Sequence, residues 1–230
     1  MKRLKGSKGI IFGATGFLGN QLAIELSKLG SELILQGRSY KKLEKLDDEI
    51  KTLGTKQILL QSDLLDKKFY GNLFNLVSSR FEYLDFLINV SGNFTRLAPL
   101  TNFSHKEWSD LIEINIVSFW RILKELESLL KKAPKPKVLV LNNKIIGEGK
   151  PFYNIFSVAN AAMKSMANIY FEENKRLKIQ IKLINIKSFN HGITSILNND
   201  NKRQLFSKEI IEKIINKGFS DQKERLFYNI

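Results

Sequence analysis

The chain has 230 residues, of which 43% are apolar, and it contains no cysteine. This length and apolar content suffice for one well-packed domain, and the lack of cysteine excludes disulfides, thiolate metal sites and cysteine nucleophiles. The 37 basic and 23 acidic residues leave a net charge of +14. The basic N-terminus leads into an apolar run too short for a signal peptide, and no segment has the length of a membrane span, so we expect a cytoplasmic protein.

The positive charge admits two interpretations. A net charge of +14 would attract a partner that bears phosphates, such as a nucleotide. The lysines are scattered, however, as at Lys41, Lys131 and Lys202, and the chain is rich in Lys, Asn and Ile, which an AT-rich genome favours whatever the function. Nucleic-acid binding is a further hypothesis, but no predicted exposed face alternates aromatic with basic residues.

Predicted strands and helices alternate along the chain. Short apolar runs rich in β-branched residues predict strands at 9–12, 32–35, 57–60, 84–88, 138–141 and 179–184. Helical periodicity predicts helices at 17–30, 39–54, 65–81, 105–132 and 156–176, and again at 207–220. Alternation of this kind implies an α/β fold: a Rossmann-like, doubly wound parallel sheet with helices on both faces. We expect one dinucleotide-binding domain over 1–230, with 190–230 as a variable C-terminal segment on the substrate side.

A glycine-rich turn follows the first predicted strand. In "IIFGATGFLGNQLAIEL" three glycines separate the strand from an amphipathic helix. Glycine lets the backbone approach a pyrophosphate, and the start of the helix supplies N–H groups and the positive end of its dipole. The turn therefore predicts nucleotide binding, although a tight turn that binds nothing has the same pattern. The binding residues would be Gly13, Thr15, Gly16, Phe17, Leu18 and Gly19.

The second predicted strand ends in "LILQGRS". Gly37 stands where a site that prefers NAD would place an acid for the ribose hydroxyls, and Arg38 follows it. A guanidinium can bind the 2′-phosphate of NADP, so this pair favours NADP over NAD. A solvated Arg38 with no ligand is the alternative.

Three further motifs follow along the chain: "QSDLLD" contains Asp63 and Leu64, "LINVSG" contains Asn89 and Gly92, and "IEINIVSFW" contains Asn115. Together they resemble the short-chain dehydrogenase/reductase family in its compact form, and most nearly oxidoreductases of the YciK type. The resemblance runs from about residue 8 to residue 185. It implies a cofactor pocket for NADP(H), with Asp63 and Leu64 near the adenine, and a small carbonyl or alcohol substrate. It also implies a homodimer or homotetramer packed through the helices at 105–132 and 156–176.

The catalytic positions depart from the family pattern. The resemblance places the family's Ser, Tyr and Lys at Asn143, Phe156 and Asn160, and only Asn115 is retained. Phenylalanine cannot donate a proton, and an amide carries no charge that would shift a neighbour's pKa. The resemblance therefore implies weak or absent oxidoreductase activity. Tyr153, one helical turn before Phe156, is a candidate substitute for the missing acid.

Three functional hypotheses follow. The first is an NADP(H)-binding protein with little turnover that acts as a sensor, scaffold or subunit. The second is an active NADPH-dependent carbonyl reductase or alcohol dehydrogenase with relocated groups such as Tyr153. The third is a protein that uses its basic surface to bind nucleic acid. His105 and His191 are isolated in the sequence, so we expect no metal site.

Overall fold

The computed structural model describes residues 4–55, 57–143, 149–177, 179–186, 208–221 and 227–229, with the backbone alone at 143. Within these residues one parallel sheet of seven strands has the order β3-β2-β1-β4-β5-β6-β7. The strands are β1 (Lys8–Phe12), β2 (Glu32–Gly37), β3 (Ile58–Gln61), β4 (Phe86–Asn89), β5 (Lys137–Asn143), β6 (Gln180–Ile186) and β7 (Phe227–Asn229). The sheet and its covering helices are the expected Rossmann-like architecture.

The strand order reverses between β1 and β4, which places the topological switch point there. Phe12, at the end of β1, pairs with Gln36 on β2 and with Asn89 on β4. Because all strands are parallel, the turns that follow β1, β2, β4 and β5 emerge at the same edge of the sheet. Ligands of open α/β sheets bind in the crevice at this point.

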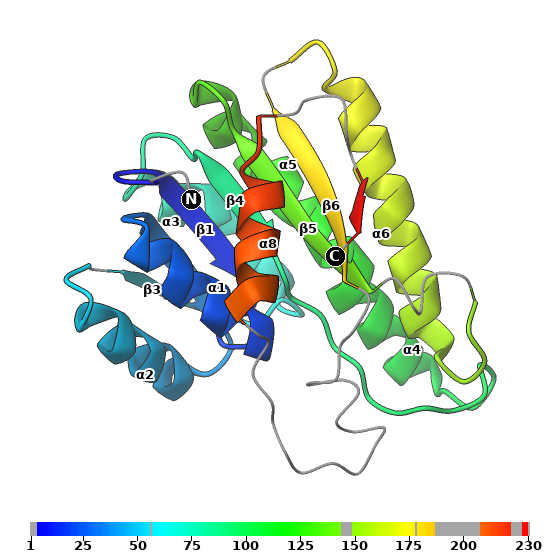
Figure 1. Ribbon diagram of the computed structural model, residues 1–230. Helices are drawn as coiled ribbons and strands as arrows, with labels where there is room; N and C mark the ends of the chain where they lie inside the picture. The colour runs from blue at the N-terminus through cyan, green and yellow to red at the C-terminus, as the bar shows by residue number, and fades with distance from the viewer. Residues whose placement is uncertain are drawn as a thin grey trace.

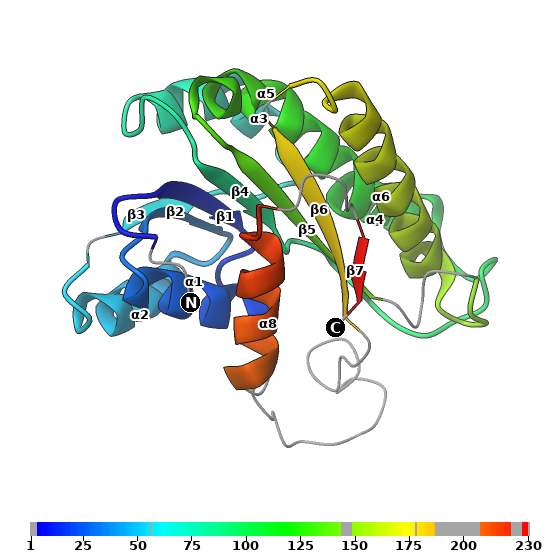
Figure 2. The ribbon, with the colours of Figure 1, turned by 45° about the horizontal axis from the view of Figure 1, so that its top comes forward.

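Helices cover both faces of the sheet, as Figures 1 and 2 show. Helices α1 (Phe17–Lys28), α2 (Tyr40–Lys51) and α8 (Lys208–Gly218) lie on one face. The other face carries α3 (Lys67–Ser78), α4 (His105–Ile112), the π-helix η1 (Glu113–Val117), α5 (Ser118–Lys132) and α6 (Asn154–Glu173). None of the described helices combines the length and the hydropathy that a membrane span requires.

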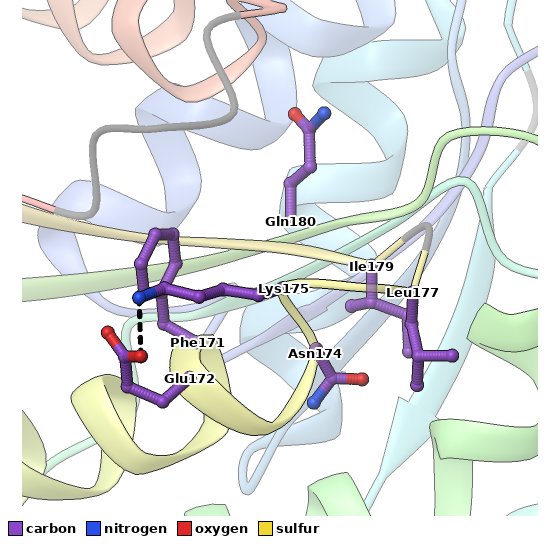
Figure 3. Close-up of a pocket in the computed structure, with 7 residues that line it drawn as sticks. All are labelled: Phe171, Glu172, Asn174, Lys175, Leu177, Ile179 and Gln180. Atoms are coloured by element: carbon purple, nitrogen blue, oxygen red, sulfur yellow. Dashed lines mark ion pairs between the residues drawn. The ribbon is translucent and has the colours of Figure 1, made fainter.

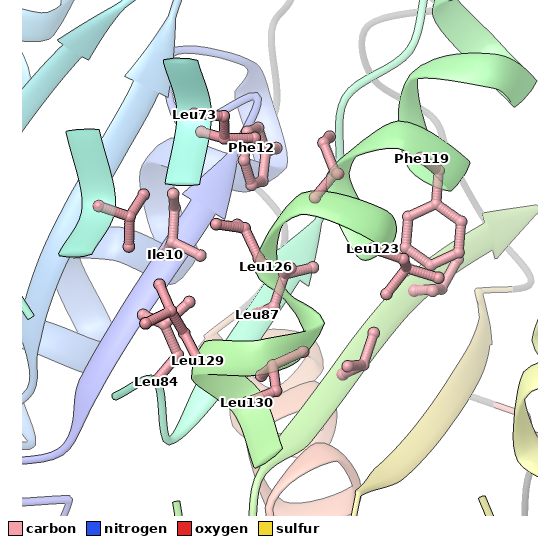
Figure 4. Packing of buried hydrophobic residues seen from close by; sticks show 14 of the residues in the cluster. Ile10, Phe12, Leu73, Leu84, Leu87, Phe119, Leu123, Leu126, Leu129 and Leu130 are labelled. Carbon is pink, nitrogen blue, oxygen red and sulfur yellow. The ribbon is translucent and has the colours of Figure 1, made fainter. Parts of the chain in front are cut away.

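Each face of the sheet has its own apolar core. Side chains alternate along a strand, so Ile10 and Phe12 of β1 point to one face and Ile11 points to the other. Ile10 and Phe12 pack with leucines from α3 and α5, such as Leu73 and Leu126 (Figure 4). On the opposite face, Ile11 belongs to the cluster formed with α1, α2 and α8. This double burial explains the nearly continuous apolar character of the strands.

The element boundaries agree with the predicted ones to within a few residues, and the local signals explain the ends. Gly30 and Gly54 take positive φ angles of 90° and 78° after α1 and α2, as left-handed caps. Ser104 and Glu107 form a capping box at the start of α4. The predicted helix at 207–220 is α8, whereas the segment without periodicity before it lies outside the described residues.

Two features differ from the prediction. The long helix expected at 105–132 contains the π-helical turn Glu113–Val117, which separates α4 from α5. The sheet also gains β7, a strand of three residues that pairs with β6. Such a short strand has too few residues to show an alternating pattern.

Candidate dinucleotide-binding crevice

The turn between β1 and α1 is closed by contacts that only glycine allows. Gly13 has a φ of +82°, and a Cβ placed on it would lie 2.8 Å from the backbone N of Ser91. A Cβ on Gly19 would lie 2.2 Å from the carbonyl oxygen of Gly13. Gly16, the N-cap, contributes no side-chain cap, and the first turn of α1 contains no acid. The positive end of the α1 dipole therefore faces the crevice uncompensated.

Gln36 ties this turn to the neighbouring strands. Its buried side chain accepts a hydrogen bond from Gly13 N at 3.1 Å through Oε1. Its Nε2 donates to the carbonyl oxygen and the hydroxyl of Ser62 at 2.8 and 3.0 Å. The backbone oxygen of Gln36 accepts from Ala14 N at 2.9 Å. Sequence reasoning missed Gln36, although a polar residue inside the apolar run "LILQG" was an available signal.

The end of β2 presents Arg38 to solvent beside this turn. A Cβ on Gly37 would lie 2.7 Å from Cγ2 of Thr15, so the Thr15 side chain occupies the space over Gly37. Packing therefore requires glycine at position 37. The same glycine also means that the acidic side chain of NAD-preferring sites is missing here. The Arg38 side chain is exposed. The backbone carbonyl oxygen of Arg38 accepts a hydrogen bond from Nε2 of Gln61 at 3.2 Å.

Asp63 and Leu64 form the turn that follows β3. Oδ1 of Asp63 accepts from Leu65 N at 3.0 Å, and the backbone oxygen of Asp63 accepts from Asp66 N at 3.0 Å. Leu64 is buried, and its carbonyl oxygen accepts from the hydroxyl of Tyr70 at 2.7 Å. The Asp63 carboxylate therefore shapes this turn at the same edge of the sheet as Arg38.

A cleft of about 160 Å³ opens on the other side of the switch point, between the ends of β4 and β5 and the starts of α1 and α6. Its walls combine apolar side chains with amides and one hydroxyl. The described lining residues are Leu18, Asn89, Val90, Ser91, Gly92, Asn115, Leu141, Asn142, Phe156, Ala159, Asn160 and Met163. The cleft thus collects Leu18, Asn89, Gly92 and three of the four family positions, although sequence reasoning gave no role to Ser91 or Asn142.

Asn115 connects two chain segments beside this cleft through hydrogen bonds of its side chain. Its Nδ2 donates to the carbonyl oxygens of Asn93 and Leu111, both at 2.9 Å, and its Oδ1 accepts from Asn93 N at 2.8 Å. Asn115 lies in the π-helical turn, and a Cβ on Gly92 would lie 3.0 Å from its Oδ1. Asn115 therefore fixes the loop after β4 against η1, and π-helical turns often occur at functional sites.

Phe156 and Asn160 lie one turn apart on α6 and face the cleft together. Nδ2 of Asn160 donates to the carbonyl oxygen of Phe156 at 2.7 Å, and its own carbonyl oxygen accepts from Nδ2 of Asn142 at 3.4 Å. The ring of Phe156 packs edge to face on Phe94, with centroids 5.5 Å apart. The side chain of Asn143 lies outside the described part of the chain.

Tyr153 is the N-cap of α6 and is not among the described residues that line the cleft. The ammonium of Lys150 lies 4.7 Å from the centre of its ring. The residues on either side are strained: Phe152 has a φ of 67° and Asn154 a φ of 40°. Asn154 fastens this segment, because its Nδ2 donates to the carbonyl oxygens of Arg96 and Phe152 at 3.1 and 2.9 Å.

A larger hollow of about 660 Å³ lies at the opposite edge of the sheet, where α6 ends and β6 begins (Figure 3). Its wall includes the ion pair between Glu172 and Lys175, and its position separates it from every motif described above. No group of three His, Cys, Asp or Glu residues that could hold a metal occurs among the residues with described positions. His105 begins α4, and His191 lies outside them.

The family assignment follows from sequence comparison. Residues 9–202 match the model of the short chain dehydrogenase family, and the chain belongs to this family. An uncharacterized oxidoreductase of Staphylococcus epidermidis is 19% identical over 215 residues, which are 94% of this chain and 92% of that protein. Nodulation protein G of a Rhizobium species is 22% identical over 207 residues, 90% of this chain and 83% of the relative.

Solved structures of the same family share the fold. A short chain dehydrogenase from Shigella flexneri complexed with NADP superposes with a TM-score of 0.89 at 16% identity, over 100% of this chain and 99% of the other. One from Escherichia coli CFT073 complexed with NADPH has a TM-score of 0.89 at 16% identity, over 99% and 98%. The oxidoreductase yciK of Escherichia coli has a TM-score of 0.88 at 16% identity, over 99% and 96%, in agreement with the expected YciK-type resemblance.

Proposed function

We propose that this protein binds NADP(H) in the crevice at the switch point and has weak or absent oxidoreductase activity. The main observation in support is the glycine turn, in which Gly13 lies against the backbone of Ser91. This turn leads into α1, whose first turn contains no acidic residue. That arrangement suits a pyrophosphate. The similar proteins from Shigella flexneri and Escherichia coli, in complex with NADP and NADPH, support the choice of cofactor.

The two halves of the cofactor would lie on either side of the switch point. The pyrophosphate would lie at the turn formed by Gly13, Thr15, Gly16, Phe17, Leu18 and Gly19. Arg38 would bind the 2′-phosphate, and Asp63 and Leu64 would lie beside the adenine. The second nucleotide would extend past Asn89 and Gly92 into the cleft.

The composition of the cleft supports impaired catalysis. Reduction of a carbonyl requires a proton at the oxygen as the hydride arrives at the carbon. Phe156 offers no proton, and Asn160 uses an amide hydrogen on the carbonyl oxygen of Phe156. The hydroxyl of Ser91 donates to Oδ1 of Asn89 at 2.6 Å. The described part of the cleft is therefore better suited to bind and orient a ligand than to transfer a proton to it.

One observation favours the second hypothesis, an active NADPH-dependent reductase or alcohol dehydrogenase. Tyr153 lies one turn before Phe156, with the ammonium of Lys150 over its ring. A phenol can act as a general acid, and a shift of the strained segment at Phe152 and Asn154 would be needed to bring Tyr153 to the cleft.

We also propose that the chain forms homodimers or homotetramers and acts as one domain with a variable segment at 190–230. The support is the apolar surface on the outer faces of α5 and α6, where Trp120, Val158 and Ile169 are exposed. Exposed apolar side chains on two neighbouring helices are typical of a subunit contact.

Calorimetric titration of the protein with NADPH and with NADH tests the proposal. We expect NADPH to bind and Arg38→Ala to weaken its affinity by about tenfold or more, because a charge-assisted contact to the 2′-phosphate is lost. NADH affinity should not change in that variant. Arg80→Ala, which removes an exposed arginine beyond the end of α3, is the matched control. If neither cofactor binds the unaltered protein, the proposal is wrong.

A further inference from the structure

On the basis of the proposed NADP(H) binding, we infer that the cleft selects the reduced cofactor over the oxidised one. The two forms differ in charge at one place: the oxidised nicotinamide ring is a cation, and the reduced ring is neutral. A dinucleotide that crosses the switch point with its first nucleotide over β1 and β2 delivers its second to β4 and β5, where the cleft lies.

The described walls of the cleft carry no formal charge. The apolar part comes from side chains such as Leu18, Leu141 and Met163, and the polar part consists of asparagines and Ser91. Asn89, Asn142 and Asn160 are themselves at most 8% exposed, so the polar groups lie in a medium with little water. A cation that enters such a medium loses its hydration without gaining a counter-charge.

Two of the amide oxygens in the cleft, those of Asn89 and Asn115, already accept hydrogen bonds from the protein. Oδ1 of Asn89 accepts from the hydroxyl of Ser91 at 2.6 Å and from Ser91 N at 3.3 Å. Oδ1 of Asn115 accepts from Asn93 N at 2.8 Å. Turning either amide toward a cationic ring would break these bonds and release the loop after β4.

The N-terminus of α6 directs its positive end at the same space. Phe156, the third residue of this helix, lines the cleft. The first turn of α6 contains no acidic residue. The aligned peptide dipoles of α6 therefore oppose a positive ring and accept a neutral one.

These three features act in the same direction, so the reduced form should bind at least about tenfold more tightly than the oxidised form. A protein with little turnover that binds in this way would be occupied in proportion to the reduced fraction of the NADP pool. The cleft would then report the redox state of that pool to whatever the protein contacts.

Calorimetric titration with NADPH and with NADP⁺, at low salt and at about 0.5 M salt, is the test. The net charge of +14 also favours the more anionic NADPH from a distance, but that contribution is screened by salt, whereas a preference set inside the cleft persists. We expect the ratio of the two dissociation constants to stay near tenfold or above at both salt concentrations. A ratio within twofold at high salt, or tighter binding of NADP⁺, would overturn the inference.

Variants that add a negative charge to the cleft test whether the preference for NADPH over NADP⁺ arises there. Asn142→Asp is isosteric, places a carboxylate on the wall of the cleft, and forfeits only the 3.4 Å bond to the carbonyl oxygen of Asn160. It should reduce the ratio by at least about threefold, because the carboxylate pairs with the cationic ring. Asn72→Asp, on the exposed surface of α3, makes the same change of net charge far from the cleft and should leave the ratio unaltered.

Ser91→Asp repeats the experiment at a half-buried position, in case a carboxylate at residue 142 prevents folding. A ratio that neither carboxylate changes would overturn the inference while leaving NADP(H) binding intact. Failure of both NADPH and NADP⁺ to bind the unaltered protein would instead overturn the proposed function, and the inference with it. The two failures are therefore distinguishable.

Discussion

Gln36 shows how a single buried amide positions the turn between β1 and α1, where we propose that the pyrophosphate binds. It contacts the backbone of Gly13 on one side and Ser62 on the other, so the ends of β1, β2 and β3 are held in one arrangement. A search for glycines does not find Gln36, because this residue lies on the next strand and not in the turn that it positions. The polar residue in an apolar run marks Gln36 as unusual, but only the strand pairing shows that it contacts the glycine turn.

Gln36→Leu should therefore weaken both stability and cofactor binding. We expect a loss of about 2 kcal/mol in the free energy of unfolding, since Gly13 N and the Ser62 oxygen lose their partners, and a fall of about tenfold in NADPH affinity. Chemical denaturation and calorimetric titration measure the two effects.

Gln57→Leu is the matched control at the opposite edge of the sheet. Oε1 of Gln57 accepts from Leu33 N at 2.9 Å, so its loss also removes a hydrogen bond to a strand backbone. Stability should fall while NADPH affinity stays unchanged. Equal losses of affinity in the two variants would contradict the role assigned to Gln36.

At the same scale, the helical spacing of Phe156 and Asn160 predicted that both face one side of their helix. The structure places them on one cleft with Asn115. Ser91 and Asn142 could not be predicted to join them, because a loop residue and a strand end acquire a role only when distant segments meet. Their amide and hydroxyl groups also have no distinctive spacing in the sequence.

At the scale of elements, α8 is docked on the sheet through a buried lysine. Lys182 of β6 is 1% exposed, and its ammonium donates to the Ser220 hydroxyl at 2.7 Å and to the carbonyl oxygen of Lys217 at 3.3 Å. The end of α8 is thereby capped by a cation. Burial, and secondarily the charge of Lys137, lowers the pKa of Lys182 from 10.5 to about 8, and Asp221 offsets part of that change.

This lowered pKa predicts a specific dependence of stability on pH. Between about pH 8 and pH 10.5 the unfolded chain holds a proton on Lys182 that the folded chain has lost. The free energy of unfolding should therefore rise through that window, by about 3 kcal/mol. The titratable groups that face Lys182 are Lys137, Lys217, Asp221 and Tyr228.

Lys182→Met isolates the contribution of this one ammonium. The difference in free energy of unfolding between the unaltered protein and the variant, measured by denaturation at several pH values, should increase from pH 8 to pH 10. A difference that stays constant across the window would show that Lys182 keeps an ordinary pKa. This interaction could not be predicted, since "IKLINI" has the pattern of a buried strand with one incidental lysine.

At the scale of the whole molecule, the order of strands and helices could be predicted because the switches between periods of about two and 3.6 residues are strong signals. The π-helical turn could not, because Glu113–Val117 continues the same apolar pattern as its neighbours. The parallel sheet brings Arg38, the glycine turn and the cleft to one edge, so the proposed nucleotide site and the family's catalytic positions lie side by side there.

Consumption of NADPH in the presence of a panel of aldehydes and ketones, followed by absorbance, tests whether the cleft supports turnover. We expect a rate no higher than background with protein that binds NADPH, and the same rate for Tyr153→Phe. Rapid consumption by the unaltered protein would contradict it. A rate that then collapses in Tyr153→Phe would identify Tyr153 as the acid.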